Sequence, residues 1–254
     1  MAYLGNSLGI GSSAVSASAS AVTAFTNTYS VDLNGTNQYL AVDALATDLA
    51  SDTTGTISLF VKPDTISTSS TDCLVVIGNG TNSYIQVSQY DGDIFVNASV
   101  AGSNKYTLRT DDAVLSTSIF KHVMVTHDGV RPRIYINNIE VASTFTVDVD
   151  RTAWIADISG NKFRIGQNPT SGGVNWFGGL LDELVVLRTA ATSEQRTALY
   201  GNSVATDVSS VSPYAWYRMG DNDGGTGTTI TDQGSGGNDA TLTNGPTFST
   251  DVPT

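Results

Sequence analysis

Cysteine is almost absent from this chain. Cys73 is the single cysteine among 254 residues, so no disulfide can form within the chain. Its apolar setting, CLVVIG, predicts a small buried hydrophobic side chain rather than a nucleophile. Long hydrophobic runs are also lacking. None approaches the ~18 apolar residues of a membrane helix, which argues against insertion into a membrane.

Positive charge and glutamate are scarce as well. The chain has 12 Lys and Arg against 24 Asp and Glu, for a net charge of −12. Glu140, Glu183 and Glu194 are its glutamates, and the other acids are Asp, which turns and calcium loops favour over helices. This negative charge argues against a nucleic-acid partner, because a phosphate backbone would be repelled. A solvated acidic surface explains the remaining charge.

Residues 1–28 contain no charged side chain at all. No Lys or Arg precedes Lys62, so the basic region of a signal peptide is missing and we expect no export by that route. The Ala, Ser and Gly of this segment are typical of a flexible linker. Its apolar opening instead favours an arm that orders against a partner. The candidate arm contacts are Tyr3, Leu4, Leu8 and Ile10.

Short strand-like segments separated by turn signals fill residues 29–200. Asn34-Gly35 between two alternating segments is a strong hairpin signal. Asp91-Gly92 and Asp128-Gly129 mark further turns, and about a dozen strands follow at this spacing. The pattern predicts an all-β fold, a two-sheet antiparallel jelly-roll sandwich. Residues 201–254 then form a C-terminal extension that is too short to be a domain.

One helix is well signalled, at Ser193–Tyr200. Thr192 is placed as its N-cap, and Gln195 closes a capping box. Upstream, Asp182 and Glu183 are adjacent in a strand and point to opposite faces. We expect Asp182 to point inward, where a carboxylate needs a cation, a metal or backbone donors, and Glu183 to point outward.

Catalytic patterns are missing. A retaining glycosidase needs two carboxylates that share one cleft, and neighbouring acids in a strand diverge. His122 falls in a strand position that favours packing, and His127 precedes an Asp-Gly turn. No G-x-S-x-G elbow occurs. We therefore predict a protein that is not an enzyme.

Several aromatic residues are candidates for stacking on sugars. They are Trp154, Trp176, Tyr90 and Tyr106, with Asn and Asp side chains as polar partners. The alternative is that these rings fill the core, as aromatic residues of a β-sandwich commonly do. The sequence leaves both interpretations open.

Four segments together resemble a laminin-G-like domain of the concanavalin A-like lectin/glucanase superfamily. They are YSVDLNGTNQYLAV, GTISLFVKP, IFKHVMVTHDGVRPRIYINNIEVAS and FRIGQNP…WFGGLLDELVVLRTAATSEQRTALY. The resemblance covers residues 29–200 and implies the sandwich fold. That fold hosts lectins, enzymes, adhesion modules and structural proteins, so it does not by itself define a function.

The segment YAWYRMGDNDGGTGTTITDQGSGGNDATL resembles the usual beginning of such a domain but stands at the C-terminus. A circular permutation within one chain, completion of a neighbour's sheet and a truncated second domain all explain this order. We favour permutation, because domain termini often lie close together. In related domains this loop and the acid of the closing strand lie near calcium. The resemblance thus implies a Ca²⁺ site at Asp182, Asp232 and Asp239, with hydrated acidic turns as the alternative.

The opening MAYLGN resembles the start of structural proteins of tailed bacteriophages. With the missing signal peptide, it leads us to predict a non-enzymatic virion protein, namely a capsid decoration, head fibre or tail component. Its arm would bind other virion proteins and copies of itself, with a homotrimer as the first expectation. The alternative function is a carbohydrate-binding module that adheres to host-surface polysaccharide.

Overall fold

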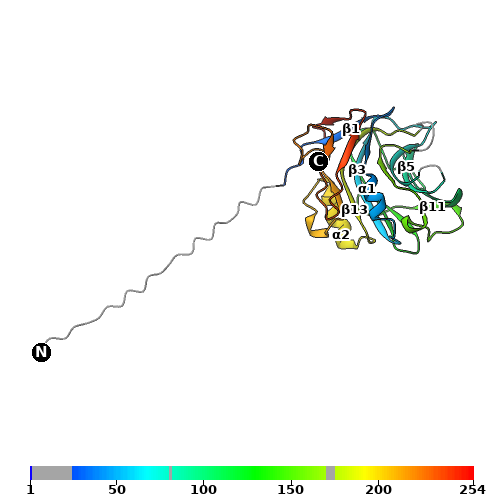
Figure 1. Cartoon of the computed structure of the whole chain (residues 1–254). Coiled ribbons are helices and arrows are strands. Elements are labelled where there is room, and N and C mark those ends of the chain that lie inside the picture. Colours follow the sequence, from blue (N-terminus) through cyan, green and yellow to red (C-terminus); the bar gives the residue numbers. More distant parts are fainter. Residues whose placement is uncertain (2–24, 80–81, 170–174) are drawn as a thin grey trace.

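Two antiparallel sheets pack face to face as a sandwich (Figure 1), which confirms the predicted fold class. The computed structural model describes residues 1, 25–79, 82–169 and 175–254. The candidate arm residues Tyr3, Leu4, Leu8 and Ile10 lie outside the described residues, so the arm stays a prediction.

The first sheet has eight strands in the order β10-β9-β8-β3-β13-β1-β17, with β14 pairing to β13 beside this path. Its strands are β1 Ser30–Asn34, β3 Gly55–Pro63, β8 Lys121–His127, β9 Pro132–Ile136, β10 Ile139–Glu140, β13 Gly178–Leu187, β14 Ala215–Tyr217 and β17 Thr247–Ser249. The second sheet has nine strands in the order β11-β7-β6-β5-β4-β12-β2-β16-β15. Its strands are β2 Tyr39–Ala41, β4 Asp72–Gly78, β5 Tyr84–Tyr90, β6 Asp93–Val100, β7 Ser103–Thr110, β11 Ser143–Asp148, β12 Lys162–Ile165, β15 Thr229–Ile230 and β16 Ala240–Thr243.

Two α-helices and three 3₁₀ turns complete the described chain. They are α1 Asp43–Asp48, α2 Ser193–Tyr200, η1 Ile155–Asp157, η2 Gly201–Ser203 and η3 Ser209–Val211. The predicted helix α2 is confirmed: the Thr192 hydroxyl accepts from the Gln195 backbone N–H at 3.3 Å, and Gln195 accepts from Thr192 at 3.0 Å. The sequence reasoning missed α1, which has no side-chain cap and is held by the burial of Leu45 and Ala46. None of the helices among the described residues is long and apolar enough to cross a membrane.

The main core lies between the two sheets and is built by strand alternation. On β5, for example, Ile85 and Val87 point into this core, whereas Gln86 between them faces outward. Cys73 is buried as predicted. Trp154 is fully buried in this core beside the ring of His127, with ring centroids 4.8 Å apart. Tyr106 is fully buried in the same core. The prediction of Trp154 and Tyr106 as sugar-stacking residues was therefore wrong, because an enclosed ring offers no face to a ligand.

A second, smaller core covers the outer face of the eight-stranded sheet. Leu199 of α2 and Val211 of η3 pack there on side chains of that sheet. The sheet residues in this cluster are Met124, Tyr135, Val185, Leu187 and Trp216. Since this face is covered by the chain's own residues, the outer face of the nine-stranded sheet is the larger sheet surface left for a ligand.

The C-terminal extension pairs with strands of its own chain. Leu184 of β13 lies opposite Tyr217 of β14, Leu40 of β2 lies opposite Leu242 of β16, and β17 adds to β1. These pairings place the C-terminal strands beside the earliest strands of the sandwich (Figure 1). Residues 201–254 thus contribute strands to both sheets.

Leu242 tests how far the extension stabilises the sandwich. Its side chain is buried in the main core, whereas that of its neighbour Thr241 is exposed. We expect Leu242→Ala to lower the free energy of unfolding by roughly 2–5 kcal/mol, as for other buried Leu truncations. The control Thr241→Ala should change it by less than about 0.5 kcal/mol. Urea denaturation measures both, and equal effects would show that β16 is not integral to the core.

Candidate functional site

The carboxylate of Asp232, one of the predicted metal ligands, accepts hydrogen bonds from three backbone N–H groups. Its Oδ1 accepts from the N–H groups of Trp216 and Gly234, both at 2.8 Å, and its Oδ2 accepts from that of Asn238 at 2.9 Å. Asp239 lies next to it and accepts from the Asp232 N–H at 2.9 Å. The two acids therefore hold the Gly-rich loop against β14.

Asp182 is fully buried. It lies on β13 beside a β-bulge, where Glu183 adopts a left-handed backbone with φ of 46°. The Asn27 amide donates to Asp182 Oδ2 at 2.9 Å, and the Glu183 N–H donates to Oδ1 at 2.8 Å. Donors from the chain, not a metal, thus satisfy this carboxylate.

Glu183 does not face outward, and that expectation was wrong. The bulge turns its side chain into the protein, where the Trp216 indole N–H and the Arg218 guanidinium donate to it. Burial raises the pKa of Glu183 to about 7, against the opposing effects of Trp216 and Arg218. Burial, and then the charge of Glu183, raises the pKa of Asp182 well above its usual range. Two adjacent acids thus lie in one enclosed site together with Arg218 and Asp221.

The residues of the implied calcium site do not fit a metal. Asp232 and Asp239 lie together, but Asp182 has other partners and does not join them. Within the described ranges, no three acids, histidines or cysteines are grouped so that they could hold a metal ion. The acidic loop is explained by hydrogen bonding within the chain.

Both histidines lie in packed surroundings. His122 is buried, with its Nε2 2.7 Å from the Ser58 hydroxyl, and burial lowers its pKa to about 3. It therefore stays neutral near pH 7. His127 is also buried, and its ring contacts the carbonyl oxygen of Arg151 at 2.9 Å.

Two of the predicted sugar-stacking residues reach the surface. Trp176 is half-buried and tilts against Tyr39, with ring centroids 5.9 Å apart. Tyr90, at the end of β5, donates its hydroxyl to the Thr68 carbonyl at 2.7 Å. Trp176 and Tyr90 line different cavities, because Tyr90 belongs to a groove on the outer face of the nine-stranded sheet.

This groove has a volume of about 350 Å³ and follows β5. Every second residue of β5 faces it, since alternate side chains of a strand share one face. Neighbouring strands and two loop segments supply the rest. The lining residues are Thr71, Tyr84, Gln86, Ser88, Tyr90, Phe95, Asn97, Thr107, Asn168 and Asn175. Three aromatic rings thus surround a floor of amides and hydroxyls.

Hydrogen bonds hold the amides of the groove floor in place. The Asn168 amide donates to Gln86 Oε1 at 2.8 Å, and the Gln86 amide donates to the Ser88 hydroxyl at 3.3 Å. The Asn97 amide donates to Thr107 Oγ1 at 2.7 Å, which leaves its buried Oδ1 without a hydrogen-bond donor. The floor is therefore preorganised, and it retains one unsatisfied acceptor.

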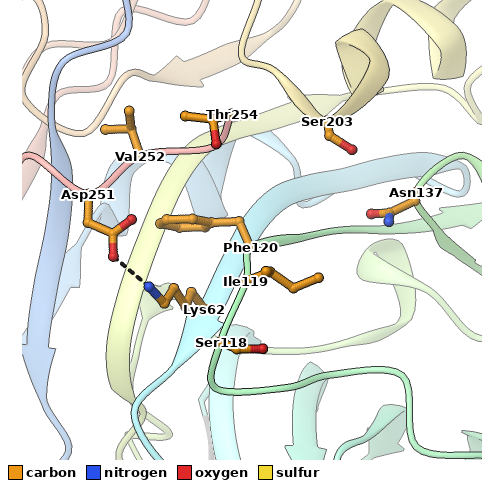
Figure 2. A pocket seen from close by; sticks show the side chains of 9 residues that line it. All are labelled: Lys62, Ser118, Ile119, Phe120, Asn137, Ser203, Asp251, Val252 and Thr254. Atoms are coloured by element: carbon orange, nitrogen blue, oxygen red, sulfur yellow. Dashed lines mark hydrogen bonds and ion pairs between the residues drawn. The ribbon is translucent and has the colours of Figure 1, made fainter.

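A second cavity, of about 210 Å³, lies between the C-terminus and the β8 side of the sandwich (Figure 2). Its centre is the ion pair of Lys62 and Asp251, 2.5 Å apart, with Phe120 and Ile119 beside it. The cation there is already paired, and the lining offers no side-chain amide other than that of Asn137. The groove on β5 has the richer set of ligand-binding groups.

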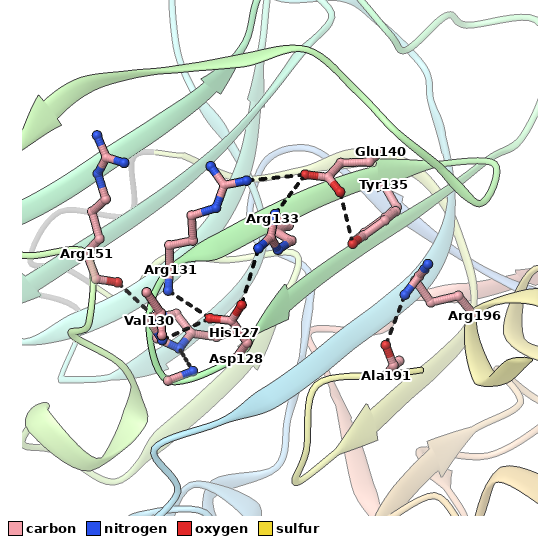
Figure 3. Close-up of polar contacts among 11 residues, drawn as sticks. His127, Asp128, Val130, Arg131, Arg133, Tyr135, Glu140, Arg151, Ala191 and Arg196 are labelled. Carbon is pink, nitrogen blue, oxygen red and sulfur yellow. Dashed lines mark hydrogen bonds and ion pairs between the residues drawn. The ribbon is translucent and has the colours of Figure 1, made fainter. Parts of the chain in front are cut away.

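Arginines gather on the eight-stranded sheet, at the β8–β9 hairpin, and on α2 (Figure 3). Arg133 pairs with Glu140 at 3.2 Å and with Asp128 at 3.4 Å, and Arg131 lies 3.6 Å from Glu140. Arg196 donates to the Ala191 carbonyl at 3.1 Å. Part of the chain's limited positive charge is thus concentrated away from the groove.

A family model described as the concanavalin A-like lectin/glucanases superfamily, of laminin-G type, matches residues 34–195. The chain belongs to this superfamily. No curated protein matches its sequence.

Solved structures share the fold at low sequence identity. The sialidase module CBM40 of Ruminococcus gnavus, bound to α2,3-sialyllactose, is 22% identical with a TM-score of 0.57, and the match covers 68% of this chain and 96% of that one. A Bacteroides ovatus protein described as a candidate carbohydrate-binding protein is 20% identical with a TM-score of 0.61, covering 90% and 62%. The NanB sialidase of Streptococcus pneumoniae is 23% identical with a TM-score of 0.55, covering 65% and 26%.

The raised pKa of Glu183 predicts a pH-dependent stability. Its protonated carboxyl contributes fully below the unfolded-state pKa, and that contribution is lost as the pH rises through about 7. Glu183→Gln keeps a neutral side chain at every pH. The variant should therefore gain roughly 2–3 kcal/mol relative to wild type between pH 5 and 8. Urea unfolding at both pH values measures this, and a difference that is the same at both would contradict it.

Proposed function

We propose that this chain is a carbohydrate-binding module whose sugar lies in the groove along β5. The observation that carries the proposal is the lining, in which Tyr84, Tyr90 and Phe95 surround the amides of Gln86 and Asn97. Aromatic faces pack on the apolar C–H faces of sugar rings, and amides exchange hydrogen bonds with sugar hydroxyls. This combination of side chains is typical of a binding site for a polyhydroxylated ligand.

The position of the groove suits this role. Most of its side chains stand on strands whose opposite faces are locked into the main core, so they are held rigidly. Tyr84 and Tyr90 stand at the two ends of β5, about 20 Å apart along an extended strand. That span exceeds one sugar ring, which favours an oligosaccharide.

The similar solved structures support the proposal, but the proposal does not depend on them. The R. gnavus CBM40 module was solved with sialyllactose bound, and the B. ovatus protein is described as a candidate carbohydrate binder. At such low identity the likeness extends to the fold, so the ligand of this chain must be argued from its own groove.

The proposed module binds without cleaving. Among the described residues that line the groove there is no carboxylate and no imidazole, so the paired acid and base of glycoside hydrolysis are missing there. The virion role depends on residues 1–28, most of which lie outside the described residues, and it stays a prediction.

Tyr84 provides the test of the groove. We expect Tyr84→Ala to weaken glycan binding about tenfold, which corresponds to the loss of about 1.4 kcal/mol. Tyr84→Phe keeps the ring and should retain most of the affinity. A glycan array identifies the best ligand, and titration calorimetry then compares wild type with the two variants. Thermal denaturation checks that both variants are folded.

Either of two results would contradict the proposal. Silence across a broad array, or an affinity that Tyr84→Ala leaves unchanged, would remove the groove as a sugar site.

A further inference from the structure

We propose that the groove selects uncharged glycans and discriminates against sialylated and uronic acid-containing ones. This inference rests on the proposed function, since it names the ligand class of the same groove. This ligand class differs from the acidic sialyllactose with which the R. gnavus module was solved.

The lining itself provides no site for a negative charge. None of the described residues that line the groove is charged at neutral pH. Its amides and hydroxyls can exchange hydrogen bonds with sugar hydroxyls, whereas a ligand carboxylate would find no cation among them. The groove therefore favours a neutral polyol.

Arg109, beside the groove, is already neutralised. It lies opposite Phe95 on the neighbouring strand, and its guanidinium covers the Phe95 ring at 4.9 Å from the centroid. Its Nε donates to the buried Asp93 carboxylate at 2.6 Å, and a second guanidinium nitrogen pairs with the same oxygen. A ligand carboxylate would have to compete with Asp93 for this cation.

Arg164, on the other side of the groove, is held in the same way. Strand pairing places Arg164, Val76, Gln86 and Asn97 in one row across β12, β4, β5 and β6. The Arg164 guanidinium pairs with both carboxylate oxygens of Asp43 and lies over the ring of Tyr39. Both arginines are thus ion-paired, and Asp43 also pairs with Lys162 at 3.0 Å.

The net charge of the whole chain is −12, so long-range electrostatics also repel an anionic glycan. Local pairing and the overall field therefore act in the same direction.

The first test is an array of matched pairs, in which each neutral oligosaccharide is printed beside its sialylated or uronic derivative. We expect the neutral member of a pair to bind at least tenfold more strongly. Binding to a neutral ligand should also change little with added salt, because no charge is paired.

The second test releases a cation. Asp93→Asn removes the acid that holds Arg109, and it should raise the ratio of acidic to neutral binding by roughly two- to fivefold. Asp43→Asn, at a more exposed carboxylate, should raise the same ratio through Arg164. This variant replaces Asp93→Asn in the test if Asp93→Asn does not fold. Glu140→Gln makes the same change of net charge on the other sheet and should leave the ratio unaltered.

The outcomes separate the two proposals. If acidic glycans bind at least as well as their neutral partners, and Tyr84→Ala abolishes that binding, the charge selectivity is wrong and the groove stands. If no glycan of either kind binds, both proposals fail. If Asp93→Asn and Asp43→Asn, folded, leave the ratio unchanged, the paired arginines do not determine the selectivity and the inference is overturned.

Discussion

The alternation of β5 between core and surface is the constraint on which both the fold and the groove depend. Ile85 and Val87 are buried between the sheets, so Tyr84, Gln86 and Ser88 must face the other way. A register slip by one residue would bury the polar set and expose the apolar one, which the core forbids. The energy that stabilises the sandwich thus also orients the groove.

The same logic explains why one sheet bears the groove and the other does not. The eight-stranded sheet is covered on its outer face by the second core, to which α2 contributes Leu199 and β14 contributes Trp216. Beside that core, the bulge at Glu183 directs a carboxylate to the Trp216 indole N–H, and Asp232 holds the backbone of β14. The acids that resembled a metal site therefore serve to attach the C-terminal extension.

Sequence reasoning predicted the elements whose signals are local. The capping box of α2, the turn glycines and the alternation of the strands depend on neighbouring residues, and the fold class followed from them. The predictions failed where a tertiary contact determines the direction or burial of a side chain. Trp154 carries no local sign of being enclosed, and the outward expectation for Glu183 assumed a regular strand without a bulge. The groove joins β5, β6 and β7 with the segments before β4 and after β12, and only Tyr90 among its residues was predicted.

The ligand proposed for this protein is a neutral oligosaccharide on the outer face of the nine-stranded sheet. The most direct measurement is an NMR titration of the isotope-labelled chain with its best neutral array ligand, following backbone amides. We expect saturable shifts concentrated in β5, β6 and β7, with α2 and the β8–β9 hairpin unchanged. Shifts concentrated around Lys62 and Phe120, or on α2, with β5 unaffected, would contradict it.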